Sequence, residues 1–145
     1  MIGLDTDVLA RIVLADDVKQ THQALELLRA CERSAEVVVV SLSVILELEW
    51  VLRSAAKLGK TAVISVLRQL LETASLQIDS EGVLEHALCL FEQEAAKADF
   101  AECLFSAQYQ RIGCRAMASF DQKAQRMPKV LHPAFAAGRP ESTDG

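Results

Sequence analysis

The sequence predicts an α/β fold in which a mostly parallel sheet is flanked by helices. Short runs of β-branched and apolar residues alternate along the chain with segments whose apolar residues recur every three or four positions. The clearest strand, at residues 36–40, is continuously apolar from Val37, as expected for a strand covered on both faces. Alternating strands and helices form right-handed βαβ units, in which the strands run parallel.

The same patterns predict the elements in chain order. Strands are expected at residues 2–4, 36–40, 75–78, 114–118 and 130–131. Helices are expected at residues 21–30, 43–56, 61–74 and 99–111, with a further one that begins at residue 80. Gly59 and Gly113 fall where two of these helices would end. Residues 1–133 are expected to form one domain, and residues 134–145 a disordered tail.

The composition limits the class of protein. A length of 145 residues suits one domain, and an apolar share of 51% is enough for a buried core. No apolar run reaches the roughly 18–20 residues that span a bilayer, and the N-terminus lacks the features of a signal peptide. The four cysteines form no Cys-x-x-Cys pair, which is typical of buried thiols in a reducing compartment. We therefore expect a cytoplasmic protein without disulfides or zinc.

The charge gives a mixed indication. A formal net charge of −5 is unusual for a protein that binds nucleic acid. A metal ion held by carboxylates would offset part of that charge, and six basic residues lie between residues 111 and 139. That stretch could form a basic surface or an ordinary solvated face, and the sequence leaves both possibilities open.

Five carboxylates follow the predicted strands or start the predicted helices. Asp5 and Asp121 come directly after strands, so both are expected at the carboxyl edge of the sheet, where ligands bind in such folds. Glu47 lies early on the helix that leaves the strand at 36–40. Asp99 and Glu102 are three residues apart at a helix start, so they share one face.

Converging carboxylates repel one another unless a cation or a proton neutralises them. A hard divalent cation such as Mg²⁺ prefers oxygen ligands, and it can lower the pKa of a water and stabilise charge on phosphorus. The sequence therefore predicts a metal-dependent phosphodiesterase.

Each carboxylate also has a simpler interpretation. Asp5 would be a helix N-cap, and Asp99 another, with Glu102 completing a capping box. Glu47 would be an exposed helix residue like its neighbour Glu49. Asp121 would be a turn residue.

Around these carboxylates the sequence resembles the PIN-domain nucleases, and most closely the VapC-type toxins of type II toxin–antitoxin pairs. Four motifs occur in family order, at residues 2–9, 43–52, 98–104 and 118–124. The resemblance implies a PIN-like α/β/α sandwich with a mostly parallel central sheet. It also implies an endoribonuclease that uses Mg²⁺ or Mn²⁺, forms a homodimer and is neutralised by a cognate antitoxin protein.

The resemblance assigns roles to the five carboxylates. Asp5, Glu47 and Asp121 match acidic positions of the family, and both members of the Asp99/Glu102 pair are carried over as well. All five are expected to be catalytic, and all except Glu47 are expected to bind the metal.

Three neighbouring residues are expected to support the carboxylates. Thr6 and Ser119 would orient them through their hydroxyl groups, and Asp7 lies beside them. The chain departs from the family at two positions. Relatives often carry Asn in place of Asp7, and many carry Asp in place of Glu102. The added charge and the longer side chain would change how the metal is held.

A surface and two alternative functions complete the predictions. Trp50 and Leu46 fall on one side of the helix at 43–56 and are expected to contact a second copy or the antitoxin.

The Asp5-Thr6-Asp7 segment also resembles the nucleophile motif of haloacid-dehalogenase-like phosphatases. The other alternative is a catalytically weak PIN-fold binding module.

Overall fold

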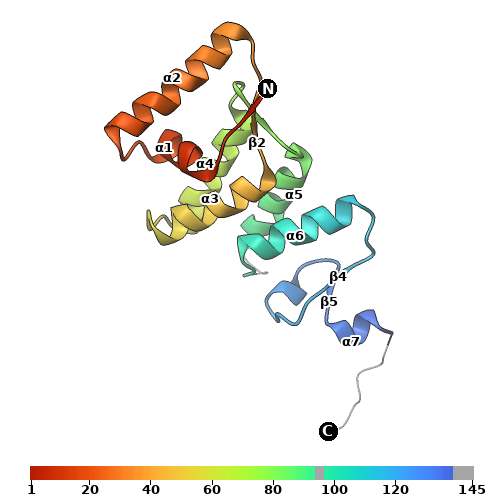
Figure 1. The fold of residues 1–145 in the computed structure, drawn as a ribbon. Helices are drawn as coiled ribbons and strands as arrows, with labels where there is room; N and C mark the ends of the chain where they lie inside the picture. The colour runs from red at the N-terminus through yellow and green to blue at the C-terminus, as the bar shows by residue number, and fades with distance from the viewer. Residues whose placement is uncertain (94–96, 139–145) are drawn as a thin grey trace. The chain divides into compact units, whose positions relative to one another are not determined.

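The computed structural model describes residues 1–93 and 97–138, which fall into two compact units, Met1–Glu81 and Gly82–Gly145 (Figure 1). All five strands in these residues pair in parallel, as predicted. They form a three-stranded sheet in the first unit and a two-stranded sheet in the second. None of the described helices is long and apolar enough to cross a membrane.

The sheet of the first unit has the strand order β1-β2-β3. Its strands are β1 (Ile2–Gly3), β2 (Val38–Val40) and β3 (Leu76–Ile78). Val38 is aligned with Ile2 on one side and with Leu76 on the other. Each strand lies within its predicted segment and is shorter than predicted by one or two residues.

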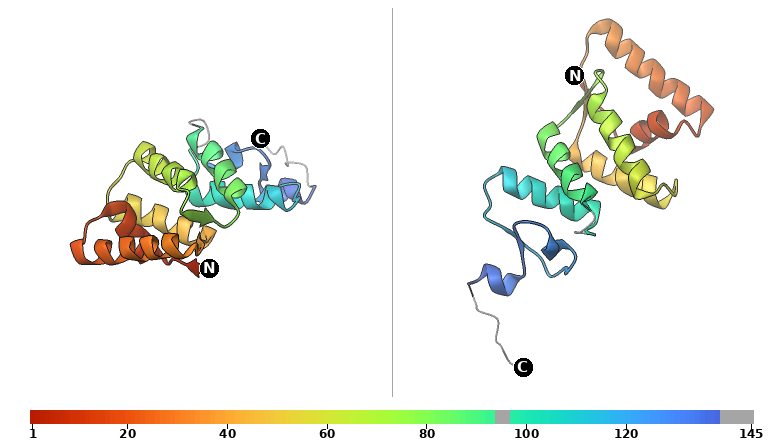
Figure 2. Two further views of the ribbon diagram at one scale, coloured as in Figure 1. Left: turned by 90° about the horizontal axis from the view of Figure 1, so that it is seen from above. Right: turned by 180° about the vertical axis from the view of Figure 1, so that it is seen from behind.

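Four helices accompany this sheet. They are α1 (Thr6–Leu14), α2 (Val18–Ser34), α3 (Leu42–Ser54) and α4 (Lys60–Glu72). α1 packs against α2 and α3, and α4 packs against α3 and β3 (Figure 2). The fully buried side chains of the unit come from these helices and from β2: Leu9, Val38, Val40, Ile45, Leu48, Leu52, Val63 and Leu67.

The second unit contains helices and a pair of short strands. Its elements are α5 (Glu81–Glu92), α6 (Phe100–Arg111), β4 (Met117–Ala118), the 3₁₀ helix η1 (Ala124–Arg126), β5 (Val130–Leu131) and α7 (Pro133–Ala136). The rings of Phe91 and Phe100 join α5 to α6, with centroids 5.5 Å apart in an edge-to-face arrangement. Met117 is aligned with Val130, which confirms the predicted final strand.

The predicted C-terminal tail is described only in part. Its first residues, up to Ala136, are helical in α7, and the side chain of Arg115 donates a hydrogen bond to the carbonyl of Ala136. Residues 139–145 lie outside the described residues.

Candidate active site

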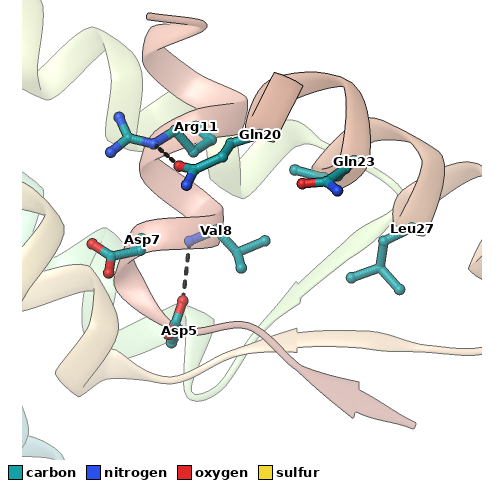
Figure 3. A pocket seen from close by; sticks show the side chains of 8 residues that line it. Asp5, Asp7, Val8, Arg11, Gln20, Gln23 and Leu27 are labelled. Atoms are coloured by element: carbon teal, nitrogen blue, oxygen red, sulfur yellow. Dashed lines mark hydrogen bonds between the residues drawn. The ribbon is translucent and has the colours of Figure 1, made fainter. Parts of the chain in front are cut away.

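Asp5 lies between β1 and α1 and is exposed to solvent. Its backbone is extended, and its Oδ1 accepts a hydrogen bond of 3.0 Å from the backbone N–H of Val8 (Figure 3). The N-cap interpretation is therefore confirmed for Asp5. The bond uses only one carboxylate oxygen, so capping and metal binding are compatible. Of its neighbours, Thr6 is buried and Asp7 is exposed in the first turn of α1.

Glu47 is exposed in the second turn of α3, whose N-cap is Ser41. Glu49 was expected to resemble it, and this expectation is wrong. The Glu49 residue is only 3% exposed, and its Oε1 accepts a 3.0 Å hydrogen bond from Nε of Arg53. A buried carboxylate paired one turn along its own helix is a structural group, because its charge is already satisfied.

Asp99 and Glu102 lie at the start of α6 in the second unit. Asp99 occupies the N-cap position, but its side chain makes no capping hydrogen bond. The predicted capping box is therefore wrong. Glu102 is half-buried in the first turn, and its pKa is raised by burial, and then by the negative charges of Asp121 and Asp99.

Asp121 follows β4 in a hydrogen-bonded turn. Its Oδ1 accepts a 2.8 Å hydrogen bond from the backbone N–H of Lys123 and a longer one from that of Ala124. The turn interpretation is confirmed, and the second carboxylate oxygen takes no part in these bonds. Ser119 fixes the same turn by accepting a 3.1 Å bond from the backbone N–H of Asp121. The hydroxyl of Ser119 therefore bonds the backbone of Asp121 and not its carboxylate.

The expected carboxylates are divided between the two units. Asp5 and Glu47 belong to the first, and Asp99, Glu102 and Asp121 belong to the second. Within either unit, the described residues contain no group of three or more acidic, His or Cys side chains arranged to hold a metal ion. In the second unit, however, the three carboxylates are close enough for two of them to raise the pKa of the third.

This donor set fits a hard divalent cation. All the candidate ligands are carboxylate oxygens, which Mg²⁺ and Mn²⁺ accept. Burial is the first cause of the raised pKa of Glu102, and the negative charges of Asp121 and Asp99 add to it; a cation would relieve that added repulsion.

Comparison with known proteins identifies the family. The PIN domain family matches residues 2–130. The chain belongs to the PIN-domain family. PIN domains are generally nucleases that use divalent metal ions, so the predicted α/β fold and the metal-dependent nuclease class agree with the family. No curated protein and no solved structure matches the chain.

The PIN-domain match has two consequences for the predictions. It spans both compact units, so all five candidate carboxylates lie within the region that defines the family. It also favours the nuclease interpretation of Asp5 and Asp7 over the phosphatase one, because the matched range includes all four acidic motifs.

The structure adds a pocket that the sequence did not indicate. A cavity of about 310 Å³ adjoins Asp5 on the side of α1 and α2. Arg11 and Gln20 line it. Neither was predicted as a site residue, because α1 was not predicted and the helix that forms α2 was expected to begin only at residue 21. Trp50, by contrast, was expected at the surface, and it is 57% exposed on α3 beside the half-buried Leu46.

Proposed function

We propose that this PIN domain is a metal-dependent endoribonuclease that acts as the toxin of a toxin–antitoxin pair. The observation that carries the proposal is the PIN-domain match over residues 2–130, which includes all five candidate carboxylates. The proximity of Asp121 and Asp99 to Glu102, which together with burial raises the pKa of Glu102, supports it. A group of mutually repelling carboxylates is stable at neutral pH when a cation joins it, and the cation is what phosphodiester hydrolysis requires.

In this proposal four carboxylates hold the ion: Asp5, Asp99, Glu102 and Asp121. When bound, Mg²⁺ or Mn²⁺ supplies positive charge for the scissile phosphate and for an attacking water. The exposed Glu47 carboxylate would orient that water and accept its proton as the water oxygen bonds to phosphorus in line. The P–O bond to the leaving ribose oxygen breaks, and that oxygen takes up a proton from solvent. The hydrogen bonds to Val8 and Lys123 fix Asp5 and Asp121, so these two carboxylates do not have to be ordered when the substrate binds.

The partners follow from the same proposal. We propose a homodimer and a cognate antitoxin protein, with Leu46 and Trp50 contributing to one of these contacts. The exposed indole of Trp50 supports this assignment, because large exposed aromatic side chains are enriched at protein interfaces.

The test compares two helix-capping aspartates. Asp17 caps α2 through a 2.9 Å bond to the N–H of Gln20, just as Asp5 caps α1. Asparagine caps a helix about as well as aspartate. Asp5→Asn and Asp17→Asn should therefore fold equally well and differ only in their rate of RNA cleavage.

Cleavage of a structured RNA by each purified variant, with Mg²⁺, with Mn²⁺ and with a chelator, measures that difference. Wild type and Asp17→Asn should cleave only with the metal. Asp5→Asn should be slower by at least about a hundredfold, because a lost ligand removes several kcal/mol of charge stabilisation. Full activity in folded Asp5→Asn would contradict the site assignment. No cleavage by the wild type over a broad RNA panel would favour a binding module with the PIN fold.

A further inference from the structure

The pocket beside Asp5 is formed within the first unit by α1, α2 and the residue that precedes α1 (Figure 3). On α2, Gln20, Gln23 and Leu27 recur at the spacing that places residues on one helix face. That face is directed toward α1, against which α2 packs. Because Asp5 lines the pocket, a group bound there lies next to one of the proposed metal ligands.

The lining suits a neutral, flat and partly polar ligand. Val8, Ala24 and Leu27 supply apolar surface, whereas Gln20 and Gln23 supply side-chain amides. An amide offers a donor and an acceptor side by side. The carboxylates of Asp5 and Asp7 would repel a phosphate group at this position, and the guanidinium of Arg11 is already engaged by Gln20 and Asp16. The amides and the apolar side chains therefore favour a heterocycle with hydrogen-bonding edges over an anion.

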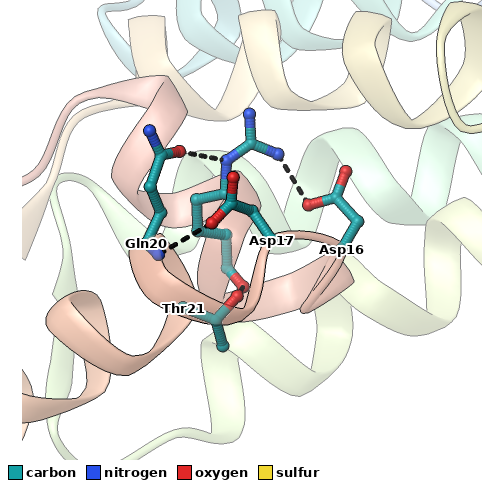
Figure 4. A network of polar contacts seen from close by, with 5 residues as sticks. Asp16, Asp17, Gln20 and Thr21 are labelled. Carbon is teal, nitrogen blue, oxygen red and sulfur yellow. Dashed lines mark hydrogen bonds and ion pairs between the residues drawn. The ribbon is translucent and has the colours of Figure 1, made fainter.

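Part of the lining is held in a fixed arrangement (Figure 4). Arg11 Nε donates a 2.7 Å hydrogen bond to Oε1 of Gln20, and Arg11 Nη1 donates a 2.6 Å bond to Oδ1 of Asp16. The hydroxyl of Thr21 donates to the carbonyl of Arg11 at 3.2 Å. Since Gln20 accepts through Oε1, its amide nitrogen remains as the donor. The polar wall is thus organised before any ligand arrives.

We propose that this pocket binds one unpaired nucleobase of the RNA, next to the phosphodiester that is cleaved, and that Gln20 and Gln23 recognise the edge of that base. The inference rests on the proposed ribonuclease function and identifies what selects its substrate. Proteins that recognise RNA sequence do so mostly on unstacked bases, whose edges are free to form hydrogen bonds. A volume of about 310 Å³ equals that of roughly ten water molecules, which is room for one base.

The experiment measures base preference in three variants. Gln23→Ala removes an amide that is proposed to recognise the base. Leu27→Phe places a larger side chain in the pocket and leaves all the carboxylates of the chain in place. Gln69→Ala is the matched control, because Gln69 is also an exposed glutamine, on α4 and outside the pocket. Substrates are four single-stranded oligoribonucleotides that differ in the base at one position beside the cleaved bond, repeated for each side.

The wild type should prefer one base at one of these positions. Gln23→Ala and Leu27→Phe should reduce that preference by about tenfold, since a specific contact to a base edge is worth roughly 1–3 kcal/mol. Gln69→Ala should keep it. The same preference in all variants, or no preference in an active wild type, overturns the inference and leaves the ribonuclease function intact.

A binding measurement separates the two proposals. Fluorescence anisotropy of the same labelled oligonucleotides is measured in the Asp121→Asn background, which lies outside the pocket. If Gln23→Ala binds the oligonucleotide with the preferred base more weakly, the result supports the pocket. It does so even if the wild type cleaves no RNA, and in that case only the proposed ribonuclease function fails. Equal binding of all four oligonucleotides by both proteins overturns the pocket.

Discussion

At the scale of single residues, Asp5 combines a structural and a proposed catalytic role. Its Oδ1 satisfies the N–H of Val8 at the start of α1. Asp5→Ala should therefore lower the free energy of unfolding by about 1 kcal/mol, whereas Asp5→Asn should leave it nearly unchanged. Urea unfolding of both variants without divalent metal measures the difference. Equal stabilities would show that the cap contributes nothing.

Glu102 should make stability depend on pH. Its folded-state pKa is raised, chiefly by burial and then by Asp121 and Asp99, so the folded chain holds the proton more tightly than the unfolded chain. The resulting stabilisation is complete below the unfolded pKa of Glu and is lost as the pH rises through the raised pKa. Without metal, Glu102→Gln should therefore melt at a higher temperature than the wild type at neutral pH, but not in acid.

Divalent cations should reverse this order at neutral pH, because the ion would stabilise the ionised Glu102 and not the amide. Thermal unfolding with and without Mg²⁺, at acid and neutral pH, tests both statements. The matched control is Glu85→Gln, an exposed position on α5. An equal effect of the two substitutions would mean that general charge reduction, and not the Glu102 site, is responsible.

The sequence predicted which acidic residues follow a strand or start a helix, but not which contacts their side chains make. Asp5 and Asp121 could be placed because each directly follows a strand. Asp99 has the spacing of a capping box, yet its side chain does not cap α6. Glu49 resembles Glu47 in sequence, yet only Glu49 is buried. Such differences depend on how a helix is rotated against its neighbours, which single-residue patterns do not determine.

At the scale of elements, two helices of the first unit end in left-handed alanines. Ala35 closes α2 with a φ of 55°, and Ala15 closes α1 with a φ of 49°. Glycine adopts this conformation without strain and is the usual residue there. Ala35→Gly should therefore raise the free energy of unfolding by about 1 kcal/mol.

A second substitution to glycine in the same helix provides the control for Ala35→Gly. Ala30 lies exposed inside α2, where glycine costs about 1 kcal/mol, so Ala30→Gly should be destabilising. Chemical denaturation of both variants measures the two effects. A loss of stability in Ala35→Gly would show that the alanine conformation is not strained.

Apolar periodicity did not by itself decide which helices were predicted: α6 shows little of it and agrees with prediction to within one residue, whereas α1 shows it clearly and was missed. α3 and α4 agree with prediction to within two residues at either end. α1 was missed although its buried residues, Thr6, Leu9 and Ala10, recur at helical spacing. The helix predicted at 99–111 forms as α6, and Ile112, which caps its end, is 76% exposed.

At the scale of the whole molecule, the family match covers candidate site residues from both compact units. The PIN-domain match runs through both units, and the proposed metal ligands come from both. The order of the motifs along the chain led to the family, which the comparison bears out. The strand pattern led to the expectation that Asp5 and Asp121 lie at one sheet edge, which stays a prediction.

Trp50 should affect assembly rather than folding. We expect a dimer in light scattering of the wild type and a shift toward monomer in Trp50→Ala, because the exposed indole on α3 would lose its partner contact. Val18→Ala is the control, since Val18 is also an exposed apolar residue but begins α2. An unchanged dimer and unchanged antitoxin binding in Trp50→Ala would exclude this side of α3 as an interface.

The parallel pairing of β1 with β2 has a consequence for the time at which the protein becomes active. Ile2 is aligned with Val38, so β1 has no partner until β2 has been synthesised. Asp121, which completes the proposed metal ligands, follows Asp5 by about 115 residues. At roughly 5–20 residues per second, a ribosome needs on the order of 6 to 23 s to cover that distance. Under the proposed function, a nascent chain would thus be harmless to RNA until Asp121 has been synthesised.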